Sequence, residues 1–302
     1  MRALLRAVAR ILPPVFVLFL FVDLLMNPNI PRLGSSTAGS GQVLLPPEAA
    51  RELLAESHRL LQSGRDEEAL KPALRLYNAY PENHIYSQTL AEIYHRRGRF
   101  REEAEYWEKF LQYAPLPLEG CPQIGQAYWA QQRYREAIGA FERCLAFDTD
   151  DTDSNFFLAH AFEMNGDLAR AAEIYGKFVA RHPTTTDCSI GLARVEARQN
   201  RLEEARKRID NVLGQHPNNV DALLVAGIVA WRESKPEQAR AYLEKGMALT
   251  NGYADYHYVL GRIDESQGRR NEALVRYARA LELQPDYEEV ARRYQALAGR
   301  RR

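Results

Sequence analysis

Small residues and turn-forming residues recur along this chain at a fixed interval of 34 residues. Seven segments align at that interval without an insertion: 50–83, 84–117, 118–151, 152–185, 186–219, 220–253 and 254–287. The eighth position is small in every segment: Ser57, Ala91, Gly125, Ala159, Ala193, Gly227 and Gly261. The twentieth position is alanine in six of the seven, and the thirty-second is proline in five. This pattern predicts stacked pairs of helices, because small residues let two helices approach closely and a turn residue ends the second helix.

The segments resemble the repeats of the tetratricopeptide repeat (TPR) family. The third carries Gly125, Tyr128, Tyr134, Ala137 and Phe141 where the family has Gly, Tyr, Tyr, Ala and an aromatic residue. The seventh has the same likeness at Leu260, Gly261, Gly268, Ala273, Tyr277, Ala280 and Pro285. The resemblance covers residues 50–287, about four-fifths of the chain. It implies an all-α fold: a right-handed α-solenoid of seven TPR-like helical hairpins within residues 48–287, followed by a capping helix and basic tail in 288–302.

Local departures from the family pattern occur at four places. Glu103 stands at the twentieth position of the second segment, where the family has a close-contact alanine. Pro72 lies inside the second helix of the first segment, and we expect it to kink that helix. Glu196 and Asp264 occupy the eleventh position of the fifth and seventh segments, which predicts less apolar helix faces there.

The last helix is expected at Glu288–Ala298, with Arg292, Arg293 and Gln295 on a polar outer face.

The N-terminal part of the chain has a different pattern. Arg2, Arg6 and Arg10 form a basic region, residues 1–10, before an apolar run, residues 11–26, that Asp23 interrupts. A basic stretch before an apolar run is typical of a transmembrane signal anchor or of a signal peptide. The context after Met26 is poor for cleavage, so we expect an uncleaved anchor, with cleavage near residues 36–38 as the alternative. Residues 27–47, rich in Gly and Ser, form a flexible linker.

The arginines of the basic region predict the orientation of such an anchor. Positively charged residues stay on the cytoplasmic side, which places the repeats on the opposite side of the membrane. We therefore expect a single-pass protein of the inner (plasma) membrane with its repeats in the periplasm. A secretory lumen, or secretion, is the alternative. The chain has no Asn-x-Ser/Thr acceptor for a glycan, which favours the bacterial case.

Composition and motifs exclude several classes of function. The chain is 46% hydrophobic and 26% charged, as globular proteins are, and its formal net charge is zero. A nucleic-acid partner is not expected, because neutralising phosphates requires a basic excess. No phosphate-binding loop, zinc-protease motif, nucleophile elbow or Cys-x-x-Cys pair occurs. We therefore expect no catalytic residue, no metal site and no cofactor.

The three cysteines allow two interpretations. Cys121 and Cys144 fall near the start of a first helix and the end of its paired second helix, so the antiparallel hairpin can bring them together as a disulfide. The alternative is two buried thiols that act as small apolar residues. Cys188 has no evident partner.

The family resemblance also indicates which side chains face a partner, because first helices line the concave face of a TPR array. Aromatic residues beside arginines are the types that dominate binding energy at protein interfaces. The candidate partner-binding groove consists of Trp129, Phe156, His160, Arg194, Arg198, Trp231, Arg232, Tyr258 and Arg262. We expect substitutions there to leave the fold intact. The alternative is that some of these side chains only pack against neighbouring helices.

Aspartates occupy the second position of four consecutive segments: Asp153, Asp187, Asp221 and Asp255. Each falls in the first turn of a helix, where a carboxylate favours the positive end of the dipole and can cap free amides. The alternative is an acidic rim that faces a basic segment of a partner.

Taken with the resemblance, these features predict a membrane-anchored TPR scaffold that mediates protein–protein interactions outside the cytoplasm. Its partner is a protein or peptide of unknown identity, and family analogy implies assembly, secretion or maturation of envelope proteins. Two alternatives stay open: a soluble periplasmic chaperone or binding protein released by signal cleavage, and a non-catalytic subunit of a membrane enzyme complex.

Overall fold

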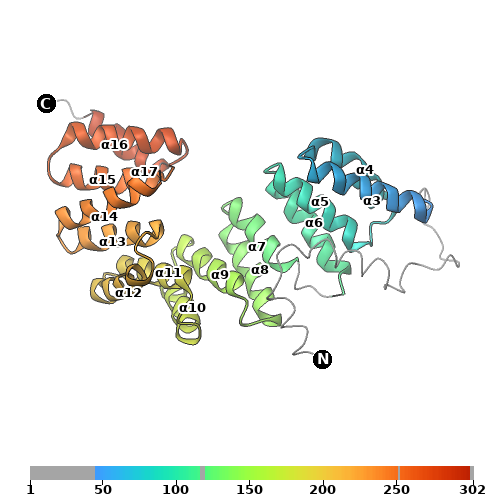
Figure 1. The fold of residues 1–302 in the computed structure, drawn as a ribbon, viewed down its shortest axis with the longest axis horizontal. Helices are drawn as coiled ribbons and strands as arrows, with labels where there is room; N and C mark the ends of the chain where they lie inside the picture. Colours follow the sequence, from blue (N-terminus) through green and yellow to red (C-terminus); the bar gives the residue numbers. More distant parts are fainter. Residues whose placement is uncertain (1–44, 116–119, 251, 300–302) are drawn as a thin grey trace. The chain divides into compact units, whose positions relative to one another are not determined.

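The computed structural model describes residues 45–115, 120–250 and 252–299, and the regular elements in these ranges are all α-helices (Figure 1). They alternate as the first and second helices of seven hairpins. The first helices are α3 (Pro47–Gln62), α5 (His84–Arg96), α7 (Cys121–Ala130), α9 (Thr152–Met164), α11 (Thr186–Arg198), α13 (Val220–Arg232) and α15 (Ala254–Ser266). The second helices are α4 (Asp66–Ala79), α6 (Phe100–Tyr113), α8 (Tyr134–Phe147), α10 (Leu168–Arg181), α12 (Leu202–Gln215), α14 (Pro236–Leu249) and α16 (Arg270–Leu283). A last helix, α17 (Glu288–Gly299), follows the seventh hairpin.

The hairpins keep the period of the sequence at their turns. Successive second helices begin 34 residues apart, from Asp66 to Arg270. The residue two places before each of these starts has a positive φ, so the chain reverses through one left-handed residue per hairpin. These residues are Gly64, Gly98, Gln132, Gly166, Asn200, Ser234 and Gly268. Glycine adopts this conformation without steric cost and asparagine tolerates it, whereas glutamine and serine are strained in it.

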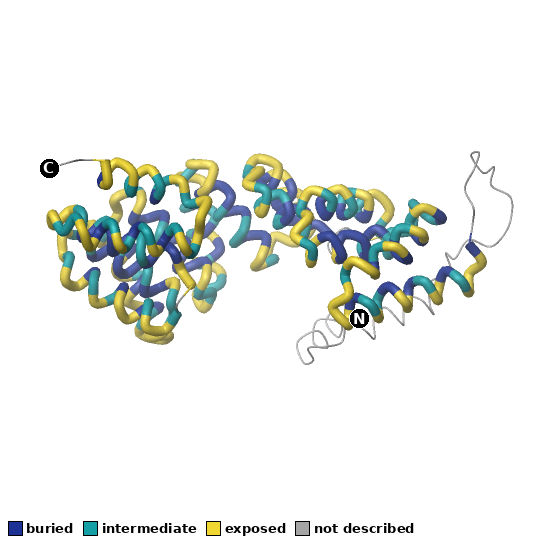
Figure 2. Tube along the Cα trace, turned by 90° about the horizontal axis from the view of Figure 1, so that it is seen from above, coloured by how far each residue is buried: buried dark blue, intermediate teal, exposed yellow. Residues whose placement is uncertain are grey.

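In the third, sixth and seventh hairpins the glycine at the eighth position makes room for a large residue on the second helix. A Cβ added to Gly125 would lie 2.4 Å from the ring of Phe141, and one added to Gly261 would lie 2.6 Å from the ring of Tyr277. Phe141 and Tyr277 are fully buried. Buried and exposed segments alternate along the helices, as Figure 2 shows, so each helix turns part of its surface toward a neighbouring helix.

Consecutive hairpins stack mainly through each second helix against the first helix that follows it, and their first helices also contact one another. From the third to the seventh hairpin each first helix contacts the next one, as α9 contacts α11 and α11 contacts α13. The second helices pack mainly against the first helices before and after them in the chain. We call the surface that the first helices present the inner face. The stack is an all-α solenoid, and α17 covers its last second helix through Val290 and Leu297.

Several expectations about single residues can be compared with this fold. Helix α4 runs unbroken through Pro72, which is buried, so Pro72 does not end the helix. Arg292 and Gln295 are exposed on α17 as expected, whereas Arg293 is half-buried and pairs with Glu289. Cys121 and Cys144 form a disulfide between α7 and α8, with their Cα atoms 5.5 Å apart.

Among the described residues no helix is both long and apolar enough to cross a bilayer. The predicted basic region 1–10 and the predicted anchor 11–26 lie outside the described residues. The same holds for residues 27–44 of the predicted linker.

Candidate partner-binding face

The nine residues predicted to face a partner all lie on first helices. Trp129 is on α7, Phe156 and His160 on α9, Arg194 and Arg198 on α11, Trp231 and Arg232 on α13, and Tyr258 and Arg262 on α15. Arg198 and Arg232 are exposed, and the other seven are half-buried. The structure brings eight of them together in three groups whose chemistry differs, and Arg232 contacts a backbone carbonyl instead.

The first group is aromatic and spans α7 and α9. The ring centroid of His160 lies 5.3 Å from that of Trp129 and 5.8 Å from that of Phe156. Burial and the nearby positive charge of Arg194 lower the pKa of His160 to about 4, so its imidazole is neutral near pH 7. The indole N–H of Trp129 is buried and has no hydrogen-bond acceptor among the described residues. These side chains therefore offer an apolar contact surface.

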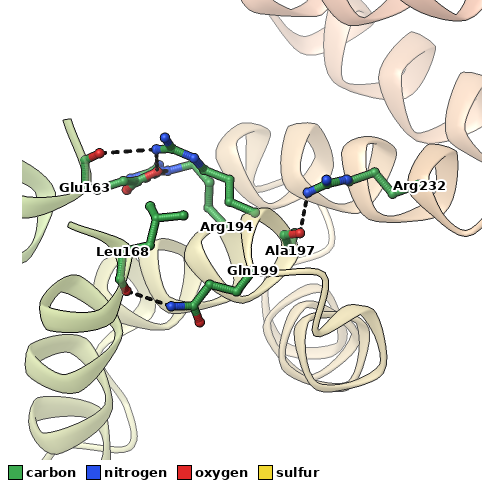
Figure 3. Close-up of polar contacts among 7 residues, drawn as sticks. Glu163, Leu168, Arg194, Ala197, Gln199 and Arg232 are labelled. Carbon is green, nitrogen blue, oxygen red and sulfur yellow. Dashed lines mark hydrogen bonds and ion pairs between the residues drawn. The ribbon is translucent and has the colours of Figure 1, made fainter. Parts of the chain in front are cut away.

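The second group holds two arginines on one buried carboxylate (Figure 3). Arg194 binds Glu163 through two hydrogen bonds, Nε to Oε1 at 2.9 Å and Nη2 to Oε2 at 2.8 Å, and Arg198 lies 3.1 Å from Oε1. The Glu163 side chain is only 3% exposed. Burial alone would raise the pKa of Glu163, but the hydrogen bonds and charge of Arg194 outweigh it and hold that pKa below its usual value. One of the four positive charges predicted for a partner is thus neutralised inside the fold.

This pairing corrects the expectation that substitutions across the candidate groove leave the fold intact. Arg194 and Arg198 come from α11, and Glu163 comes from α9, so the three residues join two successive hairpins. Reversing the charge of the arginines would leave a buried carboxylate beside new carboxylates, which is strongly unfavourable.

A recurring polar contact also joins successive hairpins. Arg198 donates to the carbonyl of Glu163 at 3.4 Å, and Arg232 donates in the same way to the carbonyl of Ala197 (Figure 3). The same contact occurs near the start of the array, where Arg96 donates to the carbonyl of Leu61 at 2.6 Å. In each case donor and acceptor are 35 residues apart. Each of these carbonyls also accepts a backbone N–H from the turn residue three places later, so the arginine adds a second donor at the end of the preceding first helix.

A second such contact runs through glutamine. Gln199 donates to the carbonyl of Leu168 at 2.9 Å (Figure 3), and Gln131 donates to the carbonyl of Phe100 at 3.0 Å. Both pairs are 31 residues apart. Polar side chains at the ends of first helices thus hold successive hairpins together. The sequence predicted partner binding for some of these residues and indicated no role for the others.

The third group stacks an arginine on aromatic rings. The guanidinium of Arg262 lies 5.0 Å from the ring centroid of Trp231 and 5.8 Å from that of Tyr258, and its Nη1 donates to the Tyr258 hydroxyl at 2.9 Å. Tyr258 in turn packs against Tyr287, with ring centroids 5.4 Å apart. Cation–π contacts of this kind orient a guanidinium without neutralising it.

The four aspartates at the second position do not form the side-chain caps of their helices. In α9 and α13 the caps are residues two places earlier: Asp151 accepts from the Ser154 amide at 2.7 Å, and Asn219 accepts from the Ala222 amide at 2.9 Å. Asp255 instead accepts from the Tyr287 hydroxyl at 2.7 Å.

These aspartates also affect one another across successive hairpins. Burial and the charges of Asp151 and Asp187 raise the pKa of Asp153. Burial, together with the charges of Asp187 and Asp255, also raises the pKa of Asp221, although Arg194 opposes this. The aspartates therefore form an acidic row along one edge of the inner face.

Acidic residues that the sequence marked only as departures prove to be buried and paired. Glu196 binds Arg208 of α12 at 2.9 Å, and Asp264 binds Arg240 of α14 at 2.6 Å. Glu103 is 2% exposed and contacts a ring nitrogen of His95 at 3.0 Å. Burial raises the pKa of Glu103 despite this contact. Buried carboxylates therefore link helices at several points of the described array.

Two hollows that the structure forms lie away from the nine residues. One, of about 140 Å³, is lined by residues of α12, α13, α14 and the turn between α13 and α14, including Arg206, Glu233 and Tyr242. The other lies on α3 and α4 beside Lys71 and Pro72. No group of three or more His, Cys, Asp or Glu residues within the described part of the chain is arranged to hold a metal ion.

The geometry described so far defines a class: an all-α solenoid of helical hairpins with an arginine- and aromatic-bearing inner face. Two family models of the tetratricopeptide repeat match residues 190–254 and 254–287, and a model described as "Anaphase-promoting complex, cyclosome, subunit 3" matches residues 130–212. These matches support the tetratricopeptide repeat family for this chain, and its fold is a TPR solenoid. No curated protein sequence matches it.

Solved structures are similar to this fold. A tetratricopeptide repeat protein of Parabacteroides merdae has a TM-score of 0.77 at 14% identity, over 83% of this chain and 100% of that one. A thermophilic TPR protein of Thermus thermophilus has a TM-score of 0.55 at 25% identity, over 60% of this chain and 98% of that one. A chain of the APC/C hetero-tetramer Cut9–Hcn1 has a TM-score of 0.60 at 15% identity, over 81% of this chain and 48% of that one. TPR repeats indicate a scaffold for protein–protein interaction, and their fold is typically non-catalytic.

Proposed function

We propose that this chain is a membrane-anchored interaction scaffold that holds a protein or peptide partner on the inner face of its repeats, outside the cytoplasm. The observation that carries the proposal is the seven-hairpin TPR solenoid itself. Its first helices present tryptophan, tyrosine and arginine side chains that are half-buried or exposed. Such residues form the energetic centres of protein interfaces when a partner removes them from water.

Two features support the location outside the cytoplasm. One is the sequence of the N-terminus, in which three arginines precede the apolar run of residues 11–26. The other is the disulfide between Cys121 and Cys144, because disulfides persist in oxidising compartments and are rare in the cytosol. In a bacterium that compartment is the periplasm, and the role we propose there is assembly, secretion or maturation of envelope proteins.

The alternative of a released periplasmic protein rests on the small residues Ser36, Thr37 and Ala38, which suit a cleavage site. The N-terminal sequence of the mature protein, recovered from cells, distinguishes the two. An N-terminus before residue 11 supports the anchor, and one near residue 39 supports release.

The proposed function is tested by crosslinking in intact cells, followed by purification of the full chain in detergent and mass spectrometry of what it carries. We expect one or a few envelope proteins to be recovered with the full chain. The control protein keeps residues 1–47 but carries an unrelated soluble domain in place of the repeats, and it should not recover them. Recovery of the same proteins with that replacement would show that the anchor, and not the repeats, selects them. Recovery of an intact enzyme complex in stoichiometric amounts would favour the subunit alternative.

A further inference from the structure

The same position of the repeat carries an arginine in two hairpins, but the two arginines meet different neighbours. Arg194 of α11 lies 31 residues after Glu163 and binds that carboxylate through two hydrogen bonds. Arg262 of α15 lies 31 residues after Trp231 and stacks on the indole. One repeat position holds Glu163 in the fourth hairpin and Trp231 in the sixth. This difference decides whether the charge of the arginine in the next hairpin is neutralised inside the fold.

The carboxylates near Arg262 in the sequence are engaged elsewhere. Asp264 pairs with Arg240 at 2.6 Å and with Arg269 at 2.7 Å. Asp255 accepts from the hydroxyl of Tyr287 at 2.7 Å. Glu265 accepts from the hydroxyl of Tyr277 at 2.6 Å and lies 3.5 Å from Arg293. Within the described part of the chain, Arg262 has no ion pair, and its contacts are to Trp231 and Tyr258.

A second uncompensated guanidinium comes from the residue next to Trp231. Arg232 is exposed, and its contact is to the backbone carbonyl of Ala197. A carbonyl accepts a hydrogen bond but carries no net charge. Trp231, Tyr258 and Arg262, which we call the aromatic–arginine cluster, therefore combine an uncompensated positive charge with two partly exposed aromatic side chains, and the second positive charge, Arg232, follows Trp231 on α13.

We propose that the aromatic–arginine cluster is the anchoring point of the partner, and that it binds an acidic side chain, Glu or Asp, of an exposed partner segment. This inference rests on the proposed function and names the chemistry of its partner. A guanidinium matches a carboxylate with two parallel hydrogen bonds, and the stacked Arg262 is already oriented for them. The indole and phenol rings supply apolar area for an aliphatic neighbour of the acidic residue. Arg194 cannot serve in this way, because its two hydrogen bonds are already made to Glu163.

The test uses the full-length chain in detergent, labelled with fluorotryptophan, which places one fluorine at each of Trp107, Trp129 and Trp231. Replacing Trp231 by Phe assigns its resonance. The probe is a peptide of sequence Gly-Glu-Leu-Glu-Leu-Gly, acetylated and amidated so that its side chains carry the only carboxylates. The matched peptide has Gln in place of both Glu residues. A third peptide has the Gln sequence with a free terminal carboxylate.

We expect the Glu peptide to move the Trp231 resonance and the Gln peptide to leave it in place. Arg262→Gln should raise the peptide concentration needed for half of the shift by at least about tenfold, because a charged hydrogen-bonding partner is lost. Arg101→Gln removes one equally positive side chain from the exposed surface of α6, where it is 81% exposed, and should leave the titration unchanged. Arg262→Lys, which keeps the charge and loses the paired hydrogen bonds, should fall between the wild type and Arg262→Gln.

The proposal is overturned if the Glu and Gln peptides act alike, if the Trp129 resonance alone moves, or if Arg262→Gln titrates like the wild type while its circular dichroism shows a folded chain. A response to the free terminal carboxylate alone overturns the assignment to a side chain. The proposed function has its own test. If crosslinking finds no partner of the repeats, the proposal of an interaction scaffold is wrong. If a partner is found and binds Arg262→Gln as well as the wild type, only the present inference is contradicted.

Discussion

Paired buried carboxylates are the residue-scale feature that most affects how this protein can be altered. Glu163, Glu196 and Asp264 are each 5% exposed or less at the side chain, and each binds one or more arginines that are partly exposed. Burying a carboxylate costs several kcal/mol unless hydrogen bonds and an opposite charge compensate it. The partners lie on neighbouring helices, so every pair also fixes one helix against the next.

Arg194→Gln tests this role of Glu163. We expect the free energy of unfolding to fall by about 2–3 kcal/mol at pH 7, because the variant leaves the buried carboxylate with Arg198 as its remaining ion-pair partner. The pKa of Glu163 in the folded chain lies below its unfolded value near 4.5, so its contribution is present above pH 4.5 and is lost as the pH falls through the folded pKa. The variant lacks the hydrogen bonds and the charge of Arg194 that lower this pKa, so a smaller part of the contribution remains.

Denaturant titrations of both proteins at pH 7 and pH 4 measure the effect, with Arg101→Gln as the control for loss of an exposed positive charge. The gap between the wild type and Arg194→Gln should narrow at the lower pH. Equal stability of the two proteins at pH 7 would show that Glu163 does not depend on Arg194.

The sequence predicted where these residues lie but not what they contact. Arg194 and Arg198 were correctly placed on one first helix, because residues four apart share a helix face. Their common partner, Glu163, is on another helix and looks like an ordinary polar residue near a helix end. Which long side chain reaches it depends on how two helices pack, and this is not encoded in either helix alone.

Hairpin turns are the element-scale feature in which sequence and geometry agree least. The left-handed turn position holds glycine in four hairpins and Gln132, Asn200 or Ser234 in the other three. The 34-residue period predicted the place of each hairpin, yet a non-glycine residue at the turn does not reveal a positive φ. The geometry of the hairpin imposes it, at a cost of about 1 kcal/mol for a residue such as glutamine.

Gln132→Gly should therefore stabilise the third hairpin. The expected gain in unfolding free energy is about 0.5–1 kcal/mol, since relief of the left-handed strain is partly offset by the greater freedom of glycine in the unfolded chain. Thermal unfolding followed by circular dichroism measures it. Gly98→Ala makes the opposite change in the second hairpin and should destabilise, because no L side chain favours its φ of 65°. If both variants melt as the wild type does, the turn is not strained.

Contacts between the two helices of a hairpin lead to a second test at this scale. Gly125→Ala would place a Cβ 2.4 Å from the buried ring of Phe141, and overpacking of this kind costs about 1–3 kcal/mol. Gly139→Ala, on the exposed side of α8 in the same hairpin, has open space around the new Cβ and should stabilise by about 0.5–1 kcal/mol. The two variants should therefore shift the melting temperature in opposite directions. Shifts of the same sign would contradict the packing of α7 against α8.

At the scale of the whole molecule, the all-α repeat fold was predictable because one spacing is repeated seven times, and each repetition is independent support for it. The candidate face was predictable only in part. The period assigned nine residues to first helices, where the structure places them, but it could not separate arginines that hold hairpins together from Arg262, which stacks on aromatic rings.

The proposed location leads to a prediction about the complete chain. A reporter that is active only outside the cytoplasm, fused after Arg302, should be active in the wild type. Changing Arg2, Arg6 and Arg10 to Glu should reduce that activity, because these residues are proposed to retain the N-terminus in the cytoplasm. Immunoblots control for expression. An inactive wild-type fusion would place the repeats in the cytoplasm and contradict the proposal.

The central claim is that the inner face binds a protein partner, and site-specific photocrosslinking in intact cells tests it most directly. A photoreactive amino acid replaces Met164 or Ile228 on the first helices α9 and α13, or Phe147 or Val275 on the second helices α8 and α16. Phe147 is 60% exposed and Val275 69%, so they are at least as accessible as Met164 at 47%. We expect Met164 and Ile228 to crosslink to the same protein and the two second-helix positions to give no product of that mass. Crosslinks to one protein from Phe147 and Val275, with none from Met164 and Ile228, would show that the partner binds the second helices and that the inner face is not the binding surface.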